Sequence, residues 1–186
     1  MKLTEFAEVR MRCRMILHNH TARHTGAAYS LFQFHMMARL DYLENFKCED
    51  IMLNLEYQST TKYKIRRSKN LLKELKSPNQ IILRSMDPNY CVLLVLVFHF
   101  EHTSLTIHQN SSPFLFNMLK QHIQALLEEI VNQEDLTLFN TNSPIGTHSI
   151  RELPATYVRR NGCTKDDMEA RGRWKFNKRI VDTALC

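Results

Sequence analysis

Two side chains in the C-terminal part of the sequence have the chemistry to bind one phosphate group together. They are His148 and Arg151, three positions apart in the segment THSIRELPATYVRR, where a helix is expected. At this spacing two side chains project from the same face of a helix. A guanidinium group donates paired hydrogen bonds to phosphate oxygens, and an imidazole can hold or release a proton near neutral pH. The pair is therefore a candidate site for phosphate chemistry.

The residues after this pair form a longer series, with Ala155-Thr156, then Gly162, then Gly172-Arg173-Trp174. The series resembles the second motif of the tyrosine recombinases, the phage-integrase-like enzymes that break and rejoin DNA. That motif runs His-x-x-Arg, then Ala-Thr, a Gly, and a Gly close to a His or Trp. The resemblance implies a mainly α fold with a small antiparallel β-sheet (α+β), similar to the catalytic core of DNA breaking-rejoining enzymes. It assigns catalytic roles to His148, Arg151 and Trp174.

An earlier segment resembles the first motif of the same family. Arg39, Phe46, Asp50 and Ile51 repeat its spacing of an Arg, an apolar residue and Asp-Ile. The match departs at Tyr42, where the family usually has Glu. The resemblance implies that Arg39 is the second catalytic arginine.

From the residues alone, residues 27–43 are expected to form one long apolar helix that contains Arg39. A charged residue near a core needs a partner or access to water. Without the resemblance, the favoured interpretation is an Arg39 that extends to the surface or pairs with Glu44.

A basic segment follows the first motif. Short strands are expected over residues 51–55 and 63–65, separated by the polar turn QSTTK. In the family a hairpin of the small sheet presents a catalytic lysine to DNA, and the resemblance assigns this role to Lys69, with Lys64 or Lys73 as alternatives. A solvated basic turn that touches only phosphates explains the residues equally well. The basic side chains expected to bind DNA phosphates are Arg66, Arg67, Arg173 and Lys175.

The resemblance implies cleavage and rejoining of a phosphodiester without a metal ion or other cofactor. Two arginines and a His or Trp would stabilise the charge that builds up on the phosphate in the transition state. A lysine would protonate the departing 5′ oxygen, and His148 would move the proton of the nucleophile. A tyrosine would attack and form a 3′-phosphotyrosyl link, which conserves the bond energy for rejoining.

The nucleophile of the family has no counterpart here. Its expected window after Trp174 holds Thr183-Ala184, and no Tyr follows Trp174. Tyr157 lies within the second motif and is expected to face the core. We therefore expect a domain that is shorter at its C-terminus than the family's and does not cleave DNA by itself.

Other segments are expected to form the scaffold. Asp87-Pro88 predicts the start of a buried helix that runs to about residue 100, and residues 117–132 predict an amphipathic helix. Gly162 predicts a helix end, and Thr164 with Asp167 a capping pair for a short helix to residue 171.

Two residues in the second motif do not favour a phosphate site on this helix. Pro154 is expected to kink its helix or limit it to the first turns. Glu152 lies beside Arg151 and is expected to screen a phosphate site.

Length and charge fit a single DNA-binding domain. The chain has 186 residues, 44% of them hydrophobic, and a formal net charge of +6. We expect residues 1–30 to be a helical lead-in and residues 31–186 the recombinase-like domain. Residues 59–76 carry seven basic residues against one acidic residue, which favours double-stranded DNA as a partner.

Cysteine and histidine usage predicts no metal site. The five cysteines form no Cys-x-x-Cys pair, so a reducing compartment, nucleus or cytoplasm, is expected. The histidines at 18, 20 and 24 have no convincing partner ligand and are expected to lie on the surface. The apolar run 91–98 is too short to cross a membrane, and no signal peptide is visible.

The sequence therefore predicts a DNA-binding domain resembling Crypton-like mobile-element recombinases, able to associate with itself or with an intact recombinase protomer. One alternative is a non-enzymatic regulatory or interaction protein derived from a recombinase. The other is an unrelated basic helical domain, in which Arg39, His148, Arg151 and Trp174 would be scattered in space.

Overall fold

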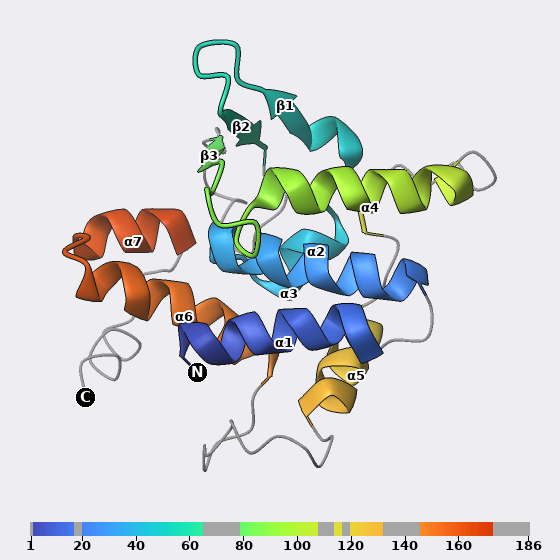
Figure 1. Cartoon of the computed structure of the whole chain (residues 1–186). Coiled ribbons are helices and arrows are strands. Elements are labelled where there is room, and N and C mark those ends of the chain that lie inside the picture. Colours follow the sequence, from blue (N-terminus) through green and yellow to red (C-terminus); the bar gives the residue numbers. More distant parts are fainter. Residues whose placement is uncertain are drawn as a thin grey trace.

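Helix α2 (His20–Met36) lies at the centre of the fold and contacts the elements on both sides of it (Figure 1). In this computed structural model, the residues described are 2–16, 20–64, 79–107, 114–116, 120–131 and 146–172. Helices α1 (Leu3–Ile16) and α4 (Val92–Ile107) pack against α2 from opposite sides. Helices α5 (Lys120–Val131) and α6 (Thr147–Arg160) complete the bundle, with α7 (Lys165–Gly172) against α6.

A small sheet lies beyond α4, at the top of Figure 1. It is antiparallel, in the order β1 (Ile51–Leu53), β2 (Thr60–Tyr63), β3 (Gln80–Leu83). Ile51 pairs with Tyr63, and Tyr63 pairs with Gln80. A short helix, α3 (Leu40–Glu44), and a 3-10 turn, η1 (Cys48–Asp50), connect α2 to the sheet. The expected fold class, mainly α with a small antiparallel sheet, is confirmed.

Several expected element boundaries are wrong. The residues expected as the polar turn QSTTK largely form β2, and the sequence analysis missed β3. The Asp87-Pro88 segment forms a turn closed by a hydrogen bond from Tyr90 N to Asp87 O (3.0 Å), so α4 begins only at Val92. Helix α4 is also not buried all round, because Val97 is 61% exposed and Phe98 41%.

Aromatic rings around Phe32 of α2 form the middle of the core. Phe32 is fully buried, and its ring lies 5.3 Å from that of Tyr63, 5.6 Å from that of Phe116 and 6.0 Å from that of Phe46, measured between centroids. Tyr29 of the same helix donates a hydrogen bond from its hydroxyl to Leu40 O (3.0 Å). These contacts fix the sheet and α3 relative to α2.

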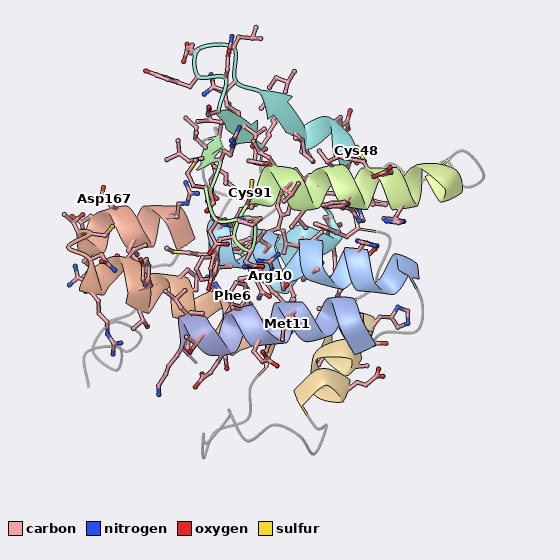
Figure 2. The ribbon with its side chains drawn as sticks, in the orientation of Figure 1. Phe6, Arg10, Met11, Cys48, Cys91 and Asp167 are labelled. Atoms are coloured by element: carbon pink, nitrogen blue, oxygen red, sulfur yellow. The ribbon has the colours of Figure 1, made fainter. Side chains whose placement is uncertain are left out.

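The N-terminal helix belongs to this same core. Phe6 of α1 is fully buried and stacks on Phe34 of α2 with ring centroids 4.7 Å apart. Figure 2 shows side chains filling the space between α1, α2 and α4. Helix α2 runs through residues 30 and 31, where the sequence analysis placed a domain boundary. No helix among the described residues is long and apolar enough to span a membrane.

A buried histidine, His99, and a half-buried one, His35, make the stability of the fold depend on pH. His99 Nε2 donates to Leu115 O (2.7 Å) and His35 Nε2 to Tyr90 O (2.8 Å), and burial lowers the pKa of both. As the pH falls below the ordinary histidine value near 6.5, the unfolded chain binds protons first. The contribution of the two neutral histidines to stability is therefore fully present above that pH and decreases as the pH falls below it.

We expect urea denaturation to give a lower free energy of unfolding at pH 5.5 than at pH 7.5, by up to about 1.4 kcal/mol per pH unit for each histidine. A His99→Gln variant keeps a hydrogen-bond donor for Leu115 O but cannot titrate. Its pH dependence should be clearly weaker than that of the wild type. An identical pH dependence in the two proteins would contradict the assignment to His99.

Candidate phosphate site

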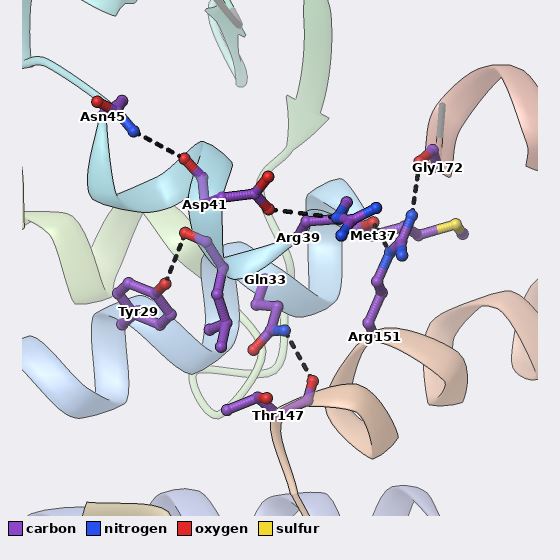
Figure 3. Close-up of polar contacts among 10 residues, drawn as sticks. Tyr29, Gln33, Met37, Arg39, Asp41, Asn45, Thr147, Arg151 and Gly172 are labelled. Carbon is purple, nitrogen blue, oxygen red and sulfur yellow. Dashed lines mark hydrogen bonds and ion pairs between the residues drawn. The ribbon is translucent and has the colours of Figure 1, made fainter. Parts of the chain in front are cut away.

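The first turn of α6 carries both residues of the second motif and is tied directly to α2. Gly146 caps the helix in an extended conformation, and its N–H donates to Ser149 Oγ (3.4 Å). Gln33 Nε2 of α2 donates to Thr147 O (2.8 Å) (Figure 3). The side chain of Gln33 is almost fully buried, so this bond fixes where α6 begins relative to α2.

The end of α2 places Arg39 near α6. The expected single helix over residues 27–43 is wrong, because Met37 adopts a left-handed conformation (φ 48°) and ends α2. Ala38 N donates to Gln33 O (3.1 Å) and Met37 N to Phe34 O (3.3 Å), which is a Schellman motif with methionine in the usual glycine position. Arg39 consequently sits at the N-cap of α3 and not inside a helix.

Arg151 is buried and holds two backbone carbonyls (Figure 3). Its Nε donates to Met37 O (3.0 Å) and its Nη2 to Gly172 O (3.1 Å). Burial is the main cause that lowers the pKa of Arg151 to about 10, with a smaller lowering effect from the nearby Arg39 and an opposing effect from Tyr42. The guanidinium stays protonated at neutral pH, and its orientation is fixed by the backbone on both sides.

Arg39 is exposed and lies beside Arg151. Its Nε is 3.3 Å from Asp41 Oδ1, so its partner is Asp41 and not the expected Glu44. Figure 3 shows the two guanidinium groups side by side next to Met37, in agreement with the electrostatic effect of Arg39 on Arg151. Two like charges at this position repel each other, and an anion between them would relieve the repulsion.

His148 has a different environment from Arg151. Its side chain is 69% exposed, and its Nε2 lies 2.9 Å from Glu152 Oε1, one turn further along α6. The two side chains were expected to project from one face of the helix. In the structure the imidazole of His148 is exposed, whereas the guanidinium of Arg151 is buried. A phosphate that binds at His148 Nε2 has to displace Glu152 from it.

Solved structures of site-specific recombinases match this architecture over the whole chain. XerH bound to its difH substrate in a pre-cleavage complex matches with a TM-score of 0.67 at 12% identity, covering 100% of this chain and 48% of XerH. XerA matches with a TM-score of 0.61 at 15% identity, covering 100% and 58%. The chain has a recombinase catalytic-domain fold.

A further XerH structure, a post-cleavage complex with palindromic difH, matches with a TM-score of 0.60 at 13% identity, covering 100% of this chain and 52% of that one. The chain thus spans about half the length of these recombinases. No protein-family model and no curated protein sequence matches it. At identities of 12–15% the likeness concerns the fold.

Within this recombinase fold, the remaining residues of the first motif are structural. Phe46 is buried in the aromatic core, and Asp50 is fully buried with its Oδ2 accepting a hydrogen bond from Lys47 N (3.0 Å). Tyr42 is 5% exposed and lies close enough to affect the pKa of Arg151. These residues support the segment between Arg39 and the first strand of the sheet.

The second motif has the expected helix end but no early break. Pro154 lacks the N–H that would pair with Ile150 O, yet α6 continues to Arg160 because residues 153–155 are buried. The expectation that Pro154 limits the helix is wrong. Gly162, with φ 88°, ends it as expected, since only glycine adopts this conformation without cost. Tyr157 is 45% exposed, so the expectation that it faces the core is also wrong.

Six predicted site residues lie outside the described part of the chain: Lys69, Arg66, Arg67, Arg173, Trp174 and Lys175. Their assigned roles stay predictions. Among the described residues no group of three or more His, Cys, Asp or Glu side chains is placed to hold a metal ion.

The sequence analysis missed the acceptors of Arg151 and the contacts of Arg171 with His35 O and Ile81 O. Met37 O and Gly172 O are backbone carbonyls, and no pattern of side chains in the sequence predicts which carbonyls Arg151 binds. Arg171, at the end of α7, was expected only as the last residue of a capped helix. The cap itself is confirmed, since Asp167 N donates to Thr164 Oγ1 (3.2 Å).

Proposed function

We propose that this chain binds double-stranded DNA as a domain of a site-specific tyrosine recombinase, of the kind found in Crypton-like mobile elements. The observation that carries the proposal is the convergence of Arg39 and Arg151, which come from segments far apart in the sequence, on a recombinase fold. A match to XerH bound to its difH substrate supports DNA as the ligand. A phosphodiester carries the single negative charge that two adjacent guanidinium groups would attract.

The two arginines have different tasks in this proposal. Arg151 is buried and fixed by two carbonyls, so it presents its guanidinium in one orientation and loses little freedom when a phosphate binds. Arg39 is exposed, and among the described residues its ion-pair partner is Asp41, so it can turn toward the phosphate when DNA displaces the carboxylate. Fixed charges at the phosphate stabilise a pentacovalent transition state more than the ground state.

His148 contributes as a proton carrier once it leaves Glu152. Lys69 and Trp174 are the residues that we propose for leaving-group protonation and for a further phosphate contact. No cofactor is needed for these steps. The basic side chains at positions 66, 67, 173 and 175 are proposed to bind flanking phosphates.

Cleavage is not part of the proposed activity of the chain by itself. No tyrosine follows Trp174 in the sequence, and burial raises the pKa of Tyr29 and Tyr63 inside the core. Incubation with nicked duplex DNA should therefore give no SDS-resistant protein–DNA adduct. We propose that the chain acts in a nuclear or cytoplasmic assembly, with copies of itself or with an intact recombinase protomer.

A salt titration of duplex binding tests the DNA-binding proposal. We expect the logarithm of the binding constant to fall steeply with the logarithm of salt concentration, because each phosphate contact releases counterions. Arg39→Ala should bind about tenfold more weakly, with a slope smaller by about 0.9, the value for one lost phosphate contact.

Arg160→Ala is the matched control, because it removes the same charge from an exposed position at the far end of α6. It should bind with nearly wild-type affinity. If the wild type binds no duplex at low salt, the DNA-binding proposal is wrong, and a non-enzymatic regulator derived from a recombinase becomes the better proposal.

A further inference from the structure

Arg171, at the end of α7, binds two other elements of the fold through backbone carbonyls. Its Nε and Nη2 both donate to His35 O of α2, at 3.2 and 3.0 Å, and its Nη1 donates to Ile81 O of β3 at 2.9 Å. The carbonyl of Arg171 in turn accepts a hydrogen bond from Gln80 Nε2 at 2.7 Å. All three nitrogens of this guanidinium are therefore used to hold the end of α7 against α2 and β3.

These contacts fix the position of the next carbonyl in the chain. Gly172 O accepts the hydrogen bond from Arg151 Nη2 (3.1 Å), while Arg151 Nε binds Met37 O (3.0 Å). The carbonyls of His35 and Met37 both lie at the C-terminal end of α2, the negative end of its dipole, where cations are stabilised. Arg151 is thus oriented by α2 directly and by α7 through Arg171.

The role of Arg171 depends on geometry more than on charge. Among the described residues it forms no ion pair with a carboxylate, and its donors all go to neutral carbonyls. A lysine has the same charge but lacks the planar fork that reaches two separate acceptors at once. Arginine is therefore required if the contacts to His35 O and Ile81 O are both to be kept.

We propose that Arg171 is a positioning residue for the phosphate site. It holds Gly172 O where Arg151 can bind it and so sets the direction in which the Arg151 guanidinium faces Arg39. It also joins the site to β3, whose first residues, Gln80 and Ile81, follow the basic segment that contains Lys69. The proposal rests on the proposed DNA-binding function.

Arg171→Lys tests this role with two measurements on the full chain. The first is the Nε–Hε signal of Arg151 in a ¹H–¹⁵N NMR spectrum, identified by its absence in Arg151→Lys. The second is the affinity for the duplex used in the salt titration. We expect Arg171→Lys to shift the Arg151 signal or broaden it beyond detection, and to weaken binding about tenfold, the size of one charge-assisted hydrogen bond.

The affinity losses of Arg171→Lys and Arg151→Lys should not add in the double variant, because both act through the same guanidinium. Gln80→Met provides a milder second variant, since it removes only the donor to the Arg171 carbonyl. It should change both measurements in the same direction and by less.

Arg159→Lys is the matched control. Arg159 Nη1 also donates to a backbone carbonyl, that of Cys163 (2.8 Å), after the end of α6 and away from Gly172. This variant should leave the Arg151 signal and the DNA affinity unchanged.

The two measurements separate the positioning role from DNA binding. An unchanged Arg151 signal in Arg171→Lys would overturn the positioning role, and so would an unchanged affinity in a wild type that does bind DNA. If the wild type binds no DNA, the proposed function fails, and the Arg151 signal alone then decides whether Arg171 positions this side chain.

Discussion

Replacing Arg151 with alanine is expected to lower the free energy of unfolding by about 3 kcal/mol, because two buried carbonyls lose their donor. The acceptors are Met37 O and Gly172 O, which lie on different elements. For a chain of this length the midpoint of thermal unfolding should fall by about 10 °C. Calorimetry and urea denaturation measure the loss.

Arg39→Ala is the control for Arg151→Ala, because it also removes an arginine of the phosphate site. Arg39 is exposed, and its surface ion pair with Asp41 contributes about 0.5 kcal/mol or less. Both variants should bind DNA more weakly, but only Arg151→Ala should be clearly less stable. Equal stability of the two variants would mean that the carbonyl contacts of Arg151 contribute little to the fold.

The second large effect is expected from Phe32→Ala. The side chain of Phe32 is fully buried between the rings of Phe46, Tyr63 and Phe116, so its loss leaves a cavity that the surrounding rings cannot fill. Such truncations cost about 4 kcal/mol. We expect a midpoint of thermal unfolding lower by about 12 °C.

Tyr57→Ala is the control for Phe32→Ala, since Tyr57 is an aromatic residue of the β1–β2 connection that is 65% exposed. It should change stability by less than about 0.5 kcal/mol. Phe32→Leu, which keeps most of the volume, should lie between the two. A Phe32→Ala protein as stable as Tyr57→Ala would contradict the central place of this ring cluster.

The Phe32 cluster also matters for the phosphate site. Phe46 and Tyr63 connect α2 to the segment after Arg39 and to the sheet, so loosening the cluster should loosen the position of Arg39 relative to Arg151. Where Phe32→Ala remains folded, its DNA affinity should therefore be reduced as well.

The sequence by itself determined the features that depend on local chemistry. Glycine at position 162 ends α6 because the chain there needs a left-handed conformation. Thr164 caps α7 because its Oγ1 accepts a hydrogen bond from Asp167 N in the first turn, and its hydroxyl donates to Asp167 Oδ2. The apolar content indicated a helix-rich protein, and the resemblance to tyrosine recombinases implied a mainly α fold with a small sheet, which is what the structure has.

Local rules failed where tertiary packing overrides propensity. Pro154 does not break α6, because Leu153, Pro154 and Ala155 are all buried and packing holds the helix together. Met37 ends α2 although methionine favours helices, because Arg151 binds the carbonyl that the left-handed turn presents. Neither outcome can be inferred from the neighbouring residues in the chain.

The candidate site shows the same division. The types and spacing of Arg39, His148 and Arg151 came from the sequence, together with the phosphate chemistry that they favour. Only the tertiary structure decided that Arg151 is buried against two carbonyls and that the imidazole of His148 contacts the carboxylate of Glu152. The hydrogen bonds from Arg171 to α2 and β3 also appear only in the folded chain. Backbone acceptors carry no sequence signature, and contacts such as that between Met37 and Arg151 join residues 114 positions apart, so they exist only once the chain has folded.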